Sequence, residues 1–282
     1  MLLRRAYAKI NVGLHVLGKR ADGYHSIATV FVPVELHDEI VIEEADTIAI
    51  RMQPSLGIDE QDNLAYRAAR LLLAMLHTTA GAKITITKHI PHGSGLGGGS
   101  SDAAATLVGL CQLWNAPNAA ELLPQLALQL GSDVPFFLQP QLAYAEGRGE
   151  VLTPLPPMPP RHVLIVAPGI HISTAWAYGQ LHRHSEHTRP RLLCDAVFAS
   201  NVSDEFLRSV CTNDFEAVVF PLYPELARIK EQLYASGATY ASLTGTGSAL
   251  YGFFPSEEHA LAAATMFPTY RTFVTRTRTD TR

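Results

Sequence analysis

The order of hydrophobic and polar residues predicts strands at the start of the chain and a helix after them. Residues 4–17 and 26–50 are rich in β-branched side chains, which favour extended structure. Residues 65–76 combine alanine and leucine in a pattern that favours a helix, and Asp62 or Asn63 is expected to cap its N-terminus. Both kinds of element therefore occur early in the chain.

A glycine-rich loop connects the next predicted strand to the next predicted helix. Residues 82–90 alternate apolar and polar side chains over most of their length, which is typical of a strand with one solvated face. The sequence PHGSGLGGGSSD follows at residues 91–102, and its polar capping residues predict that a helix begins close to Ser101. Residues 119–130 predict a further helix, which ends at Gly131.

A proline-rich stretch divides the chain near its middle. Residues 154–160 hold five prolines in seven positions, which excludes a helix or a central strand, so we expect an extended linker here. After it, residues 162–168 predict a buried strand, residues 225–236 a helix and residues 247–254 another strand. Strands and helices without a regular alternation indicate an α+β fold.

Length and composition set the broad class. A chain of 282 residues is long enough for two domains, which we place at residues 1–155 and 161–282. With 47% hydrophobic and 17% charged residues, and no apolar run near ~18 residues, the sequence is typical of a soluble globular protein without a membrane segment. The apolar segment at the start is too short for a secretory signal, so we expect a cytoplasmic protein.

Cysteines, histidines and net charge narrow the function classes. Cys111, Cys194 and Cys211 are odd in number and widely spaced, which fits neither a disulfide framework nor a zinc site. Residues 182–187 hold three histidines with an arginine between them, and a solvated loop is a better interpretation than a metal site. A net charge of −4 argues against nucleic acid as a partner.

The chemistry of the glycine-rich loop favours phosphate. Five of the seven residues from Gly93 to Gly99 are glycine, which leaves the backbone open to close approach. A P-loop requires a lysine, and none occurs between Lys88 and Lys230. The loose Gly-x-Gly-x-x-Gly pattern lacks the buried strand and the later acid of a dinucleotide site. A flexible surface loop is the simpler alternative, but we expect the backbone N–H groups and the helix N-terminus to cradle a triphosphate.

Three segments resemble one kinase family. The run Pro-x-x-x-Gly-Leu-Gly-Gly-Gly-Ser-Ser-Asp-Ala-Ala from Pro91 resembles the ATP-binding motif of the GHMP kinases, which include galactokinase, homoserine kinase, mevalonate kinase and phosphomevalonate kinase. Residues 7–25 resemble the first motif of this family, and residues 242–250 resemble its third. The resemblance implies a two-domain α+β fold with the active site in the cleft between the domains.

The resemblance also assigns the co-substrate. It implies ATP bound by the glycine-rich loop and Mg²⁺ bound with the phosphates, with the Ser101 hydroxyl as a possible ligand of the ion. The residues expected to bind ATP are Pro91, Gly93, Ser94, Gly95, Leu96, Gly97, Gly98, Gly99, Ser100 and Ser101.

Two charged residues are candidates for catalysis. Asp133 follows a helix end and precedes Val-Pro-Phe-Phe, an apolar setting that perturbs a carboxylate. Lys9 lies in an apolar predicted strand, where an unpaired ammonium is costly and pairing with Asp133 would remove that cost. The resemblance implies that Asp133 is the general base and that Lys9 stabilises charge in the transition state. The alternatives are an ordinary turn at Asp133 and an edge-strand lysine that extends to solvent.

The acceptor is expected from a narrower resemblance. The start Ala-Lys-Ile-Asn, the Gly-Tyr-His at residues 23–25 and residues 131–137 are similar to the GHMP kinases that act on 4-diphosphocytidyl-2-C-methyl-D-erythritol. This implies phosphorylation of the C2 hydroxyl of that small molecule, in the nonmevalonate route to isoprenoid precursors. Another kinase of the family, acting on homoserine or mevalonate, and a silent nucleotide sensor are the alternatives.

The narrower resemblance names residues for the acceptor. Tyr24 offers a flat face for the cytosine and His25 offers ring nitrogens for its polar edge. A second aromatic for the opposite face is expected at Tyr178, with Trp176 as the competitor. Asn11 lies two residues after Lys9, so in a strand the two share a face, and Asn11 is expected to hydrogen-bond the methylerythritol hydroxyls. A second glycine turn, Thr-Gly-Thr-Gly at residues 244–247, is expected to contribute Thr244 and Gly245, unless it is only a tight turn between a helix and a strand.

Overall fold

The computed structural model describes residues 1–77, 79–181, 193 and 203–278. The chain forms two compact units, and each unit is assembled from separate stretches of sequence. Strands β1 (Leu2–Lys19) and β2 (His25–Ala45) each contribute residues to both units. Unit 1 comprises Met1–Ala8, Leu36–His92 and Gly97–Pro140, and unit 2 comprises Lys9–Glu35, Gly93–Leu96 and Gln141–Arg282.

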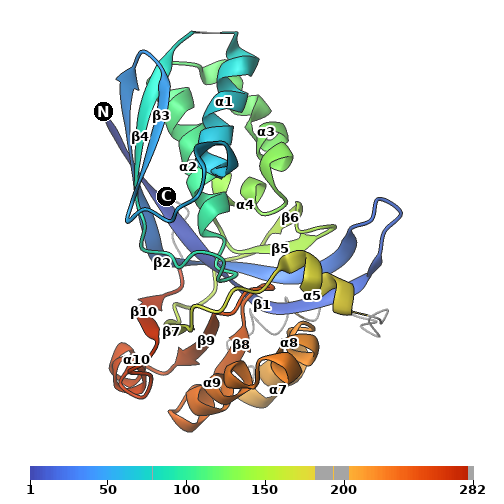
Figure 1. The fold of residues 1–282 in the computed structure, drawn as a ribbon. Helices are drawn as coiled ribbons and strands as arrows, with labels where there is room; N and C mark the ends of the chain where they lie inside the picture. Colours follow the sequence, from blue (N-terminus) through green and yellow to red (C-terminus); the bar gives the residue numbers. More distant parts are fainter. Residues whose placement is uncertain (78, 182–192, 194–202, 279–282) are drawn as a thin grey trace. The chain divides into compact units, whose positions relative to one another are not determined.

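Unit 1 combines a small sheet with a layer of helices (Figure 1). Its elements besides β1 and β2 are β3 (Ile48–Gln53), α1 (Leu64–Leu76), β4 (Gly81–Thr87), α2 (Gly98–Leu113), α3 (Leu123–Leu130) and α4 (Val134–Leu138). The strand order is β3-β4-β2, with β4 parallel to β3 and antiparallel to β2. Helices α1, α2 and α3 pack on one another, and α4 packs on α2 and α3. This arrangement places the start of α2 directly after the glycine-rich loop.

The helices of unit 1 begin close to where the sequence predicts. The side chain of Asn63 caps α1 by accepting a hydrogen bond of 2.9 Å from the backbone N–H of Ala65, which decides between the two expected caps. Helix α2 begins at Gly98, earlier than predicted, because Gly97 turns the chain with a φ of 75° and the next two glycines adopt helical geometry. Residues expected to start a helix at 119 form a 3₁₀ turn over Pro117–Leu122 before α3.

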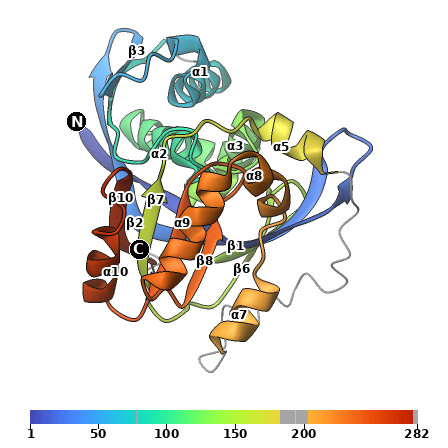
Figure 2. The same ribbon diagram turned by 60° about the horizontal axis from the view of Figure 1, so that its bottom comes forward.

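Unit 2 contains a four-stranded sheet and the part of the six-stranded sheet β3-β4-β2-β5-β6 that includes β5 and β6 (Figure 2). Its strands besides β1 and β2 are β5 (Ala143–Glu146), β6 (Val151–Pro154), β7 (His162–Ala167), β8 (Tyr240–Leu243), β9 (Leu250–Phe254) and β10 (Arg271–Arg276). Its helices are α5 (Thr174–Gln180), α7 (Asp204–Val210), α8 (Glu216–Leu222), α9 (Pro224–Ala235) and α10 (Glu257–Ala264). Strand β2 pairs with β5, which pairs with β6, while β10, β7, β9 and β8 form an antiparallel sheet in that order.

The core of unit 2 lies between the antiparallel sheet and its helices. Helix α9 packs on β8 and β9, and α10 packs on β7, β9 and β10. Leu164 and Leu250 from the sheet are fully buried there, together with Leu233 from α9. Strand β1 adds Leu14 and Val16 to the same cluster. Unit 2 therefore draws its interior from both ends of the sequence.

The proline-rich stretch lies within unit 2. Residues 155–160 have no regular secondary structure, as their prolines predict, but the strands on either side, β6 and β7, belong to the same compact unit. Met158 is buried. The expected domain division at residues 155 and 161 stays a prediction, because the compact units of a structure need not coincide with the domains that define a protein family.

Strands and helices are mixed without regular alternation, which confirms the α+β class. In the part of the chain that the structure describes, no helix combines the length and the apolar character that crossing a membrane requires.

Candidate active site

The loop between β4 and α2 requires glycine at three of its positions. Gly93, Gly95 and Gly97 have φ angles of 66°, 88° and 75°, a region that residues with a Cβ rarely adopt. The next two glycines, Gly98 and Gly99, form the first turn of α2. The glycine run therefore serves two purposes, a turning loop (residues 91–97) and an open helix N-terminus.

Part of this loop packs against a second turn of unit 2. A Cβ added to Gly95 would lie 2.0 Å from the carbonyl oxygen of Thr244, and one added to Gly247 would lie 2.1 Å from the carbonyl carbon of Ser94. The backbone N–H of Ala249 donates to the Ser94 carbonyl at 3.1 Å. Residues 244–249 connect β8 to β9, so they form a turn between two strands and not between a helix and a strand. Gly95 and Gly247 are thus required by close backbone contact.

The N-terminus of α2 lies in unit 1 and presents backbone donors. The first N–H groups of a helix have no acceptor within the helix, and the helix dipole adds positive potential there. Gly98 and Gly99 carry no side chain over this end, while the Ser100 side chain is half-buried and Ser101 is buried. The Ser101 backbone N–H already donates to Gly97 at 2.9 Å, as the first bond of the helix. This end of α2 has the features of an anion site.

A buried lysine and two carboxylates lie beside the same helix start. The ammonium of Lys88 contacts the carboxylate of Asp38 and lies 2.7 Å from Oδ2 of Asp102. Asp38 also accepts from the backbone N–H groups of His89 at 2.5 Å and Ile90 at 2.8 Å, so it fixes the chain that enters the glycine loop. The Lys88 Nζ would lie 3.4 Å from a Cβ at Gly98. The sequence analysis did not find this group, because Asp38 is distant in sequence.

The three charges perturb one another. Burial, with a contribution from the Asp38 carboxylate, raises the pKa of the Asp102 carboxyl to about 7, although Lys88 opposes the change. Burial would by itself lower the pKa of Lys88, but the two carboxylates outweigh it and raise that pKa. One ammonium therefore faces two acids, and one of the acids takes up a proton near neutral pH.

Lys9 and Asn11 share one face of β1, as predicted. The Lys9 side chain is 3% exposed, its Nζ donates to Oδ1 of Asn11 at 2.5 Å, and it lies 5.0 Å from the ring centroid of Phe31. Asn11 in turn donates from Nδ2 to the hydroxyl of Thr29 at 3.0 Å. The Thr29 hydroxyl donates to the Gly13 carbonyl at 2.5 Å. The Asn11 carboxamide is thus oriented with its oxygen towards the ammonium.

Thr244 reaches the same asparagine. Its hydroxyl accepts a hydrogen bond of 3.2 Å from the backbone N–H of Asn11 and lies 3.4 Å from both Asn11 Oδ1 and the Gly95 carbonyl oxygen. The Tyr251 hydroxyl donates to the Asn11 carbonyl at 2.7 Å. The structure therefore brings together Lys9, Asn11, Thr244 and Gly95, all within unit 2. Gly245 follows in the turn with a φ of 61°.

The aromatic residues of unit 2 form a stacked pair. The rings of His25 and Tyr178 lie 5.0 Å apart with an interplanar angle of 24°, and Tyr178 also meets the ring of Phe215 edge-on at 4.8 Å. Burial and the nearby Lys19 lower the pKa of His25, which favours the neutral form of its ring. Tyr178 therefore lies beside His25, and their expected roles in binding the cytosine stay a prediction.

Tyr24 and Trp176 are placed differently. Tyr24 is 52% exposed, and the Arg148 guanidinium lies 4.4 Å from its ring centroid. Trp176 meets Tyr223 edge-on at 6.3 Å. Between the two candidates for the second aromatic, the geometry favours Tyr178.

Asp133 is positioned by the start of α4 in unit 1. It is half-buried and follows the chain turn at Gly131, and the next residue, Val134, is buried with Phe136 and Phe137. This is the apolar setting that the sequence predicts. The pairing of Asp133 with Lys9 stays a prediction, since the two residues belong to different units.

Comparison with known families decides the class of the protein. The family described as GHMP kinases N terminal domain matches residues 63–140, and the one described as GHMP kinases C terminal matches residues 185–270. Together these matches cover more than half of the chain. The chain belongs to the GHMP kinase family. It is therefore a small-molecule kinase, and ATP is the co-substrate of this family.

Individual relatives of this GHMP kinase point to one branch. The 4-diphosphocytidyl-2-C-methyl-D-erythritol kinase of Chlorobium luteolum is 44% identical over 92% of this chain and 90% of its own length. That of Chlorobaculum parvum is also 44% identical, over 93% of this chain and 91% of its own. The crystal structure of a 4-(cytidine 5'-diphospho)-2C-methyl-D-erythritol kinase is 35% identical, covers 98% of this chain and 99% of its own, and superposes with a TM-score of 0.80.

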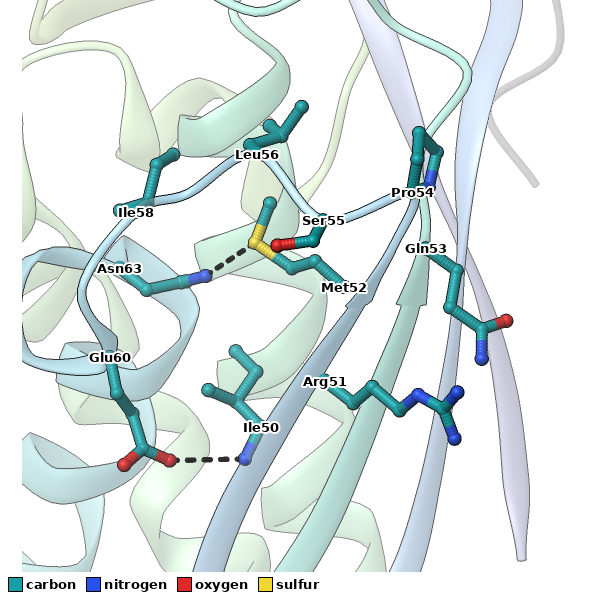
Figure 3. Close-up of a pocket in the computed structure, with 10 residues that line it drawn as sticks. All are labelled: Ile50, Arg51, Met52, Gln53, Pro54, Ser55, Leu56, Ile58, Glu60 and Asn63. Carbon is teal, nitrogen blue, oxygen red and sulfur yellow. Dashed lines mark hydrogen bonds between the residues drawn. The ribbon is translucent and has the colours of Figure 1, made fainter.

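Unit 1 of this GHMP kinase also contains a hollow that the sequence analysis did not predict (Figure 3). It has a volume of about 580 Å³ and lies along the connection from β3 to α1, with Arg51, Glu60 and Asn63 in its wall. Asn63 precedes Leu64, whose Cδ1 would lie 3.7 Å from a Cβ at Gly99. The hollow therefore lies close to the start of α2. It was missed because its residues carry no motif.

The described residues of this GHMP kinase contain no group of three His, Cys, Asp or Glu side chains that would hold a metal ion. The histidines at 182–187 and Cys194 lie outside the described residues, so the expectation of a solvated loop there stays a prediction.

Proposed function

We propose that this GHMP kinase transfers the γ-phosphoryl group of ATP to the C2 hydroxyl of 4-diphosphocytidyl-2-C-methyl-D-erythritol and releases ADP. The observation that carries the proposal is that relatives with this activity in their names match at 44% identity over more than nine tenths of the chain. The reaction belongs to the nonmevalonate route to isoprenoid precursors, as the sequence predicts.

Two side chains supply the chemistry of the transfer. The Asp133 carboxylate accepts the proton of the acceptor hydroxyl, and the apolar residues after it favour a reactive carboxylate. The Lys9 ammonium stabilises the charge that develops on the transferred phosphoryl group. Phosphoryl transfer requires little of the protein beyond positioning of the reactants and such charge stabilisation. The hydrogen bond from Lys9 to Asn11 supports this role, because it fixes the ammonium before the substrates bind.

The triphosphate binds at the glycine loop and at the N-terminus of α2. The open backbone at Gly97, Gly98 and Gly99 supports this, together with the Ser100 and Ser101 hydroxyls. Mg²⁺ enters with the phosphates, a mode that needs only one or two protein oxygens, and the Ser101 hydroxyl is our candidate. The base and ribose occupy the hollow between β3 and α1, which adjoins the start of α2.

The acceptor binds in unit 2. Its cytosine stacks on Tyr178, with Tyr24 on the opposite face and the neutral His25 ring at the polar edge as one donor and one acceptor. Two rings 5.0 Å apart leave no room for a third, because an inserted ring needs about 7 Å between its neighbours. Binding of the base therefore displaces His25 from the face of Tyr178. The methylerythritol hydroxyls lie towards Asn11, Thr244 and Gly245.

The experiment measures ADP release with three acceptors and two variants. The wild type is expected to have a higher kcat/KM for the cytidyl substrate than for mevalonate or homoserine. Asp133→Asn is expected to lower kcat about 100-fold or more while the Kd for ATP, measured by calorimetry, stays within a few fold. Asp46→Asn, an exposed carboxylate in the same unit, is the matched control and should keep full activity.

A larger kcat/KM for mevalonate or homoserine would overturn the proposed acceptor. Unchanged turnover in Asp133→Asn would remove Asp133 from the mechanism without affecting the choice of acceptor.

A further inference from the structure

A buried asparagine holds the turn that carries Thr244. Asn213 lies between α7 and α8 and is buried. Its Nδ2 donates to the Leu243 carbonyl at 2.9 Å and to the Gly245 carbonyl at 3.0 Å, so the two acceptors flank Thr244 on either side. Its Oδ1 accepts from the backbone N–H of Phe215 at 3.0 Å. Three hydrogen bonds thus leave the carboxamide one orientation.

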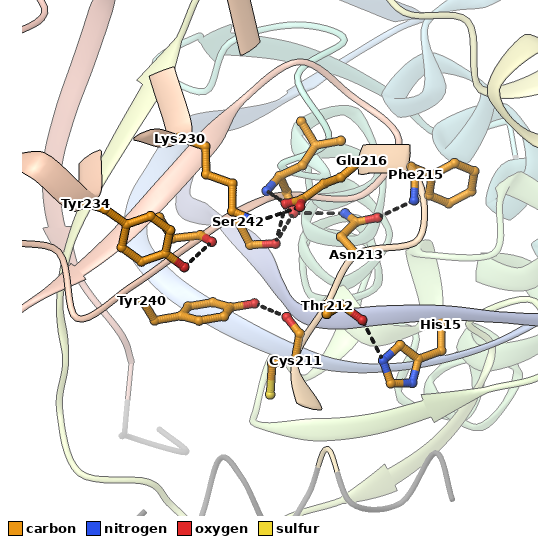
Figure 4. Close-up of polar contacts among 12 residues, drawn as sticks. His15, Cys211, Thr212, Asn213, Phe215, Glu216, Lys230, Tyr234, Tyr240 and Ser242 are labelled. Carbon is orange, nitrogen blue, oxygen red and sulfur yellow. Dashed lines mark hydrogen bonds and ion pairs between the residues drawn. The ribbon is translucent and has the colours of Figure 1, made fainter. Parts of the chain in front are cut away.

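Glu216, three residues after Asn213, holds the end of β8, the strand that leads into this turn. Oε1 of Glu216 accepts from the Leu243 backbone N–H at 2.9 Å and from the Ser242 hydroxyl at 3.1 Å. Its other oxygen, Oε2, pairs with Lys230 of α9 at 2.5 Å. The 213–216 segment therefore contacts β8 and the start of the turn through side-chain donors and acceptors on both sides of Leu243 (Figure 4).

The 213–216 segment is itself attached to β1. The Leu14 N–H donates to the Thr212 carbonyl at 2.8 Å, and the Asp214 N–H donates to the Leu14 carbonyl at 2.9 Å. The Asp214 side chain accepts from the Val16 N–H at 2.7 Å. The strand that carries Lys9 and the turn that carries Thr244 are therefore both bonded to one short segment.

The same segment supports the aromatic pair. Phe215 is fully buried and meets Tyr178 edge-on at 4.8 Å, and Tyr178 stacks on His25. Phe215 receives its position from Asn213, whose oxygen accepts the Phe215 N–H. A displacement of Asn213 would thus reach the turn directly and the aromatic pair through Phe215.

We infer that Asn213 is a positioning residue of the kinase reaction, which sets the Thr244 turn against Lys9 and Asn11. The inference rests on the proposed function, since it takes Thr244 and Gly245 to contact the reacting groups. Phosphoryl transfer depends on alignment, and a displacement of about 1 Å costs on the order of 100-fold in rate. Both amide hydrogens of Asn213 are directed at the carbonyls that flank Thr244, so their loss releases the turn.

The test compares Asn213→Asp with Tyr234→Phe in the full chain. Asn213→Asp keeps the shape but replaces both donors by an oxygen that repels the two carbonyls. We expect kcat to fall about 100-fold while KM for ATP and for the cytidyl substrate changes less than about threefold. Tyr234→Phe removes one bond of 3.2 Å to the Ala241 carbonyl, on the same strand but away from the turn, and should keep kcat within about twofold.

The control for correct folding is the binding of cytidine 5′-diphosphate, measured by calorimetry. Its stoichiometry gives the fraction of active molecules in each preparation, and every kcat is divided by that fraction. If Asn213→Asp binds none, Asn213→Ala supplies the comparison, because it removes the donors, together with the acceptor of the Phe215 N–H, without adding charge. An unchanged kcat per active molecule overturns the inference. Loss of binding in both variants also overturns it, since the role of Asn213 would then be in folding alone.

Failure of the proposed function gives a different result. A wild type that turns over mevalonate or homoserine instead of the cytidyl substrate overturns the acceptor, and the same kcat comparison is then made on the acceptor that reacts.

Discussion

The ammonium of Lys9 is held by neighbours on its own strand, β1, and on β2. Asn11 accepts its hydrogen bond and the Phe31 ring lies 5.0 Å away, so two groups of unit 2 stabilise an ammonium on a residue that is only 3% exposed. The Asn11 carboxamide is itself bonded to Thr29. We therefore assign Asn11 a second task besides contact with the acceptor, which is to fix the direction of the ammonium.

At the residue scale, Asp102 is expected to make stability depend on pH. The pKa of its carboxyl is raised from 3.8 to about 7 in the folded protein, so between these values the folded chain keeps a proton that the unfolded chain releases. This group therefore lowers the free energy of unfolding as pH rises from about 4 to about 7, by up to a few kcal/mol.

Urea unfolding at pH 5 and pH 8 measures this contribution. The carboxyl is absent in Asp102→Asn. From pH 5 to pH 8 we expect the free energy of unfolding of this variant to fall less than that of the wild type, or to rise. Equal pH dependence in both proteins would contradict the raised pKa of Asp102.

At the element scale, contacts within the protein require glycine at some positions of the glycine loop, as the approach of a ligand does at others. Gly95 lies against the Thr244 carbonyl, and Gly98 lies beside Lys88 and Ile90. A run of glycines that predicts only an open backbone thus includes positions with different neighbours. The sequence indicates the loop but not which glycine faces protein.

Gly95→Ala tests this difference within the loop. The added Cβ would lie 2.0 Å from the Thr244 oxygen at a φ of 88°, so either the loop or the 244–249 turn must move. We expect a loss of stability of about 2 kcal/mol or more and a strongly reduced kcat, measured by denaturation and ADP release.

Gly237→Ala is the matched control. Its φ of 95° is similarly unfavourable, but nothing lies within 4 Å of the added Cβ. It should lose only the strain of the backbone, about 1 kcal/mol, and keep its activity. Equal losses in both variants would show that contact with Thr244 is not what requires glycine at position 95.

At the scale of the whole molecule, ligands are expected to protect separate parts of the chain. If ATP binds at the start of α2, it should slow amide exchange at residues 97–104 and 50–60. Cytidine 5′-diphosphate should do so at residues 23–26 and 176–180. Where an amide exchanges only after a local opening that releases the ligand, its exchange rate falls by a factor of 1 + [L]/Kd. This factor is about 100 at a ligand concentration of 100 Kd. Protection by ATP confined to residues of unit 2 would contradict the proposed triphosphate site.

Local pattern predicts the elements of this fold well. The Asn63 cap and the helix expected at residues 225–236 follow from side chains close in sequence, and the structure confirms both, with the helix at Pro224–Ala235. The positions of Asn213 and Asp38 do not follow, because their partners lie about 30 or more residues away and no local signal marks such contacts. The sequence motifs likewise indicate Tyr178 but do not separate it from Trp176, and the ring contact with His25 is the observation that favours Tyr178.

The interior of unit 2 has a consequence for synthesis on the ribosome. Leu14 and Val16 leave the exit tunnel more than 200 residues before Leu250 and Phe267, which belong to the same buried cluster. At 5–20 residues per second the wait is on the order of ten seconds or more. Throughout that time the apolar face of β1 lacks these late partners, so the nascent chain is expected to depend on chaperones until they have been made.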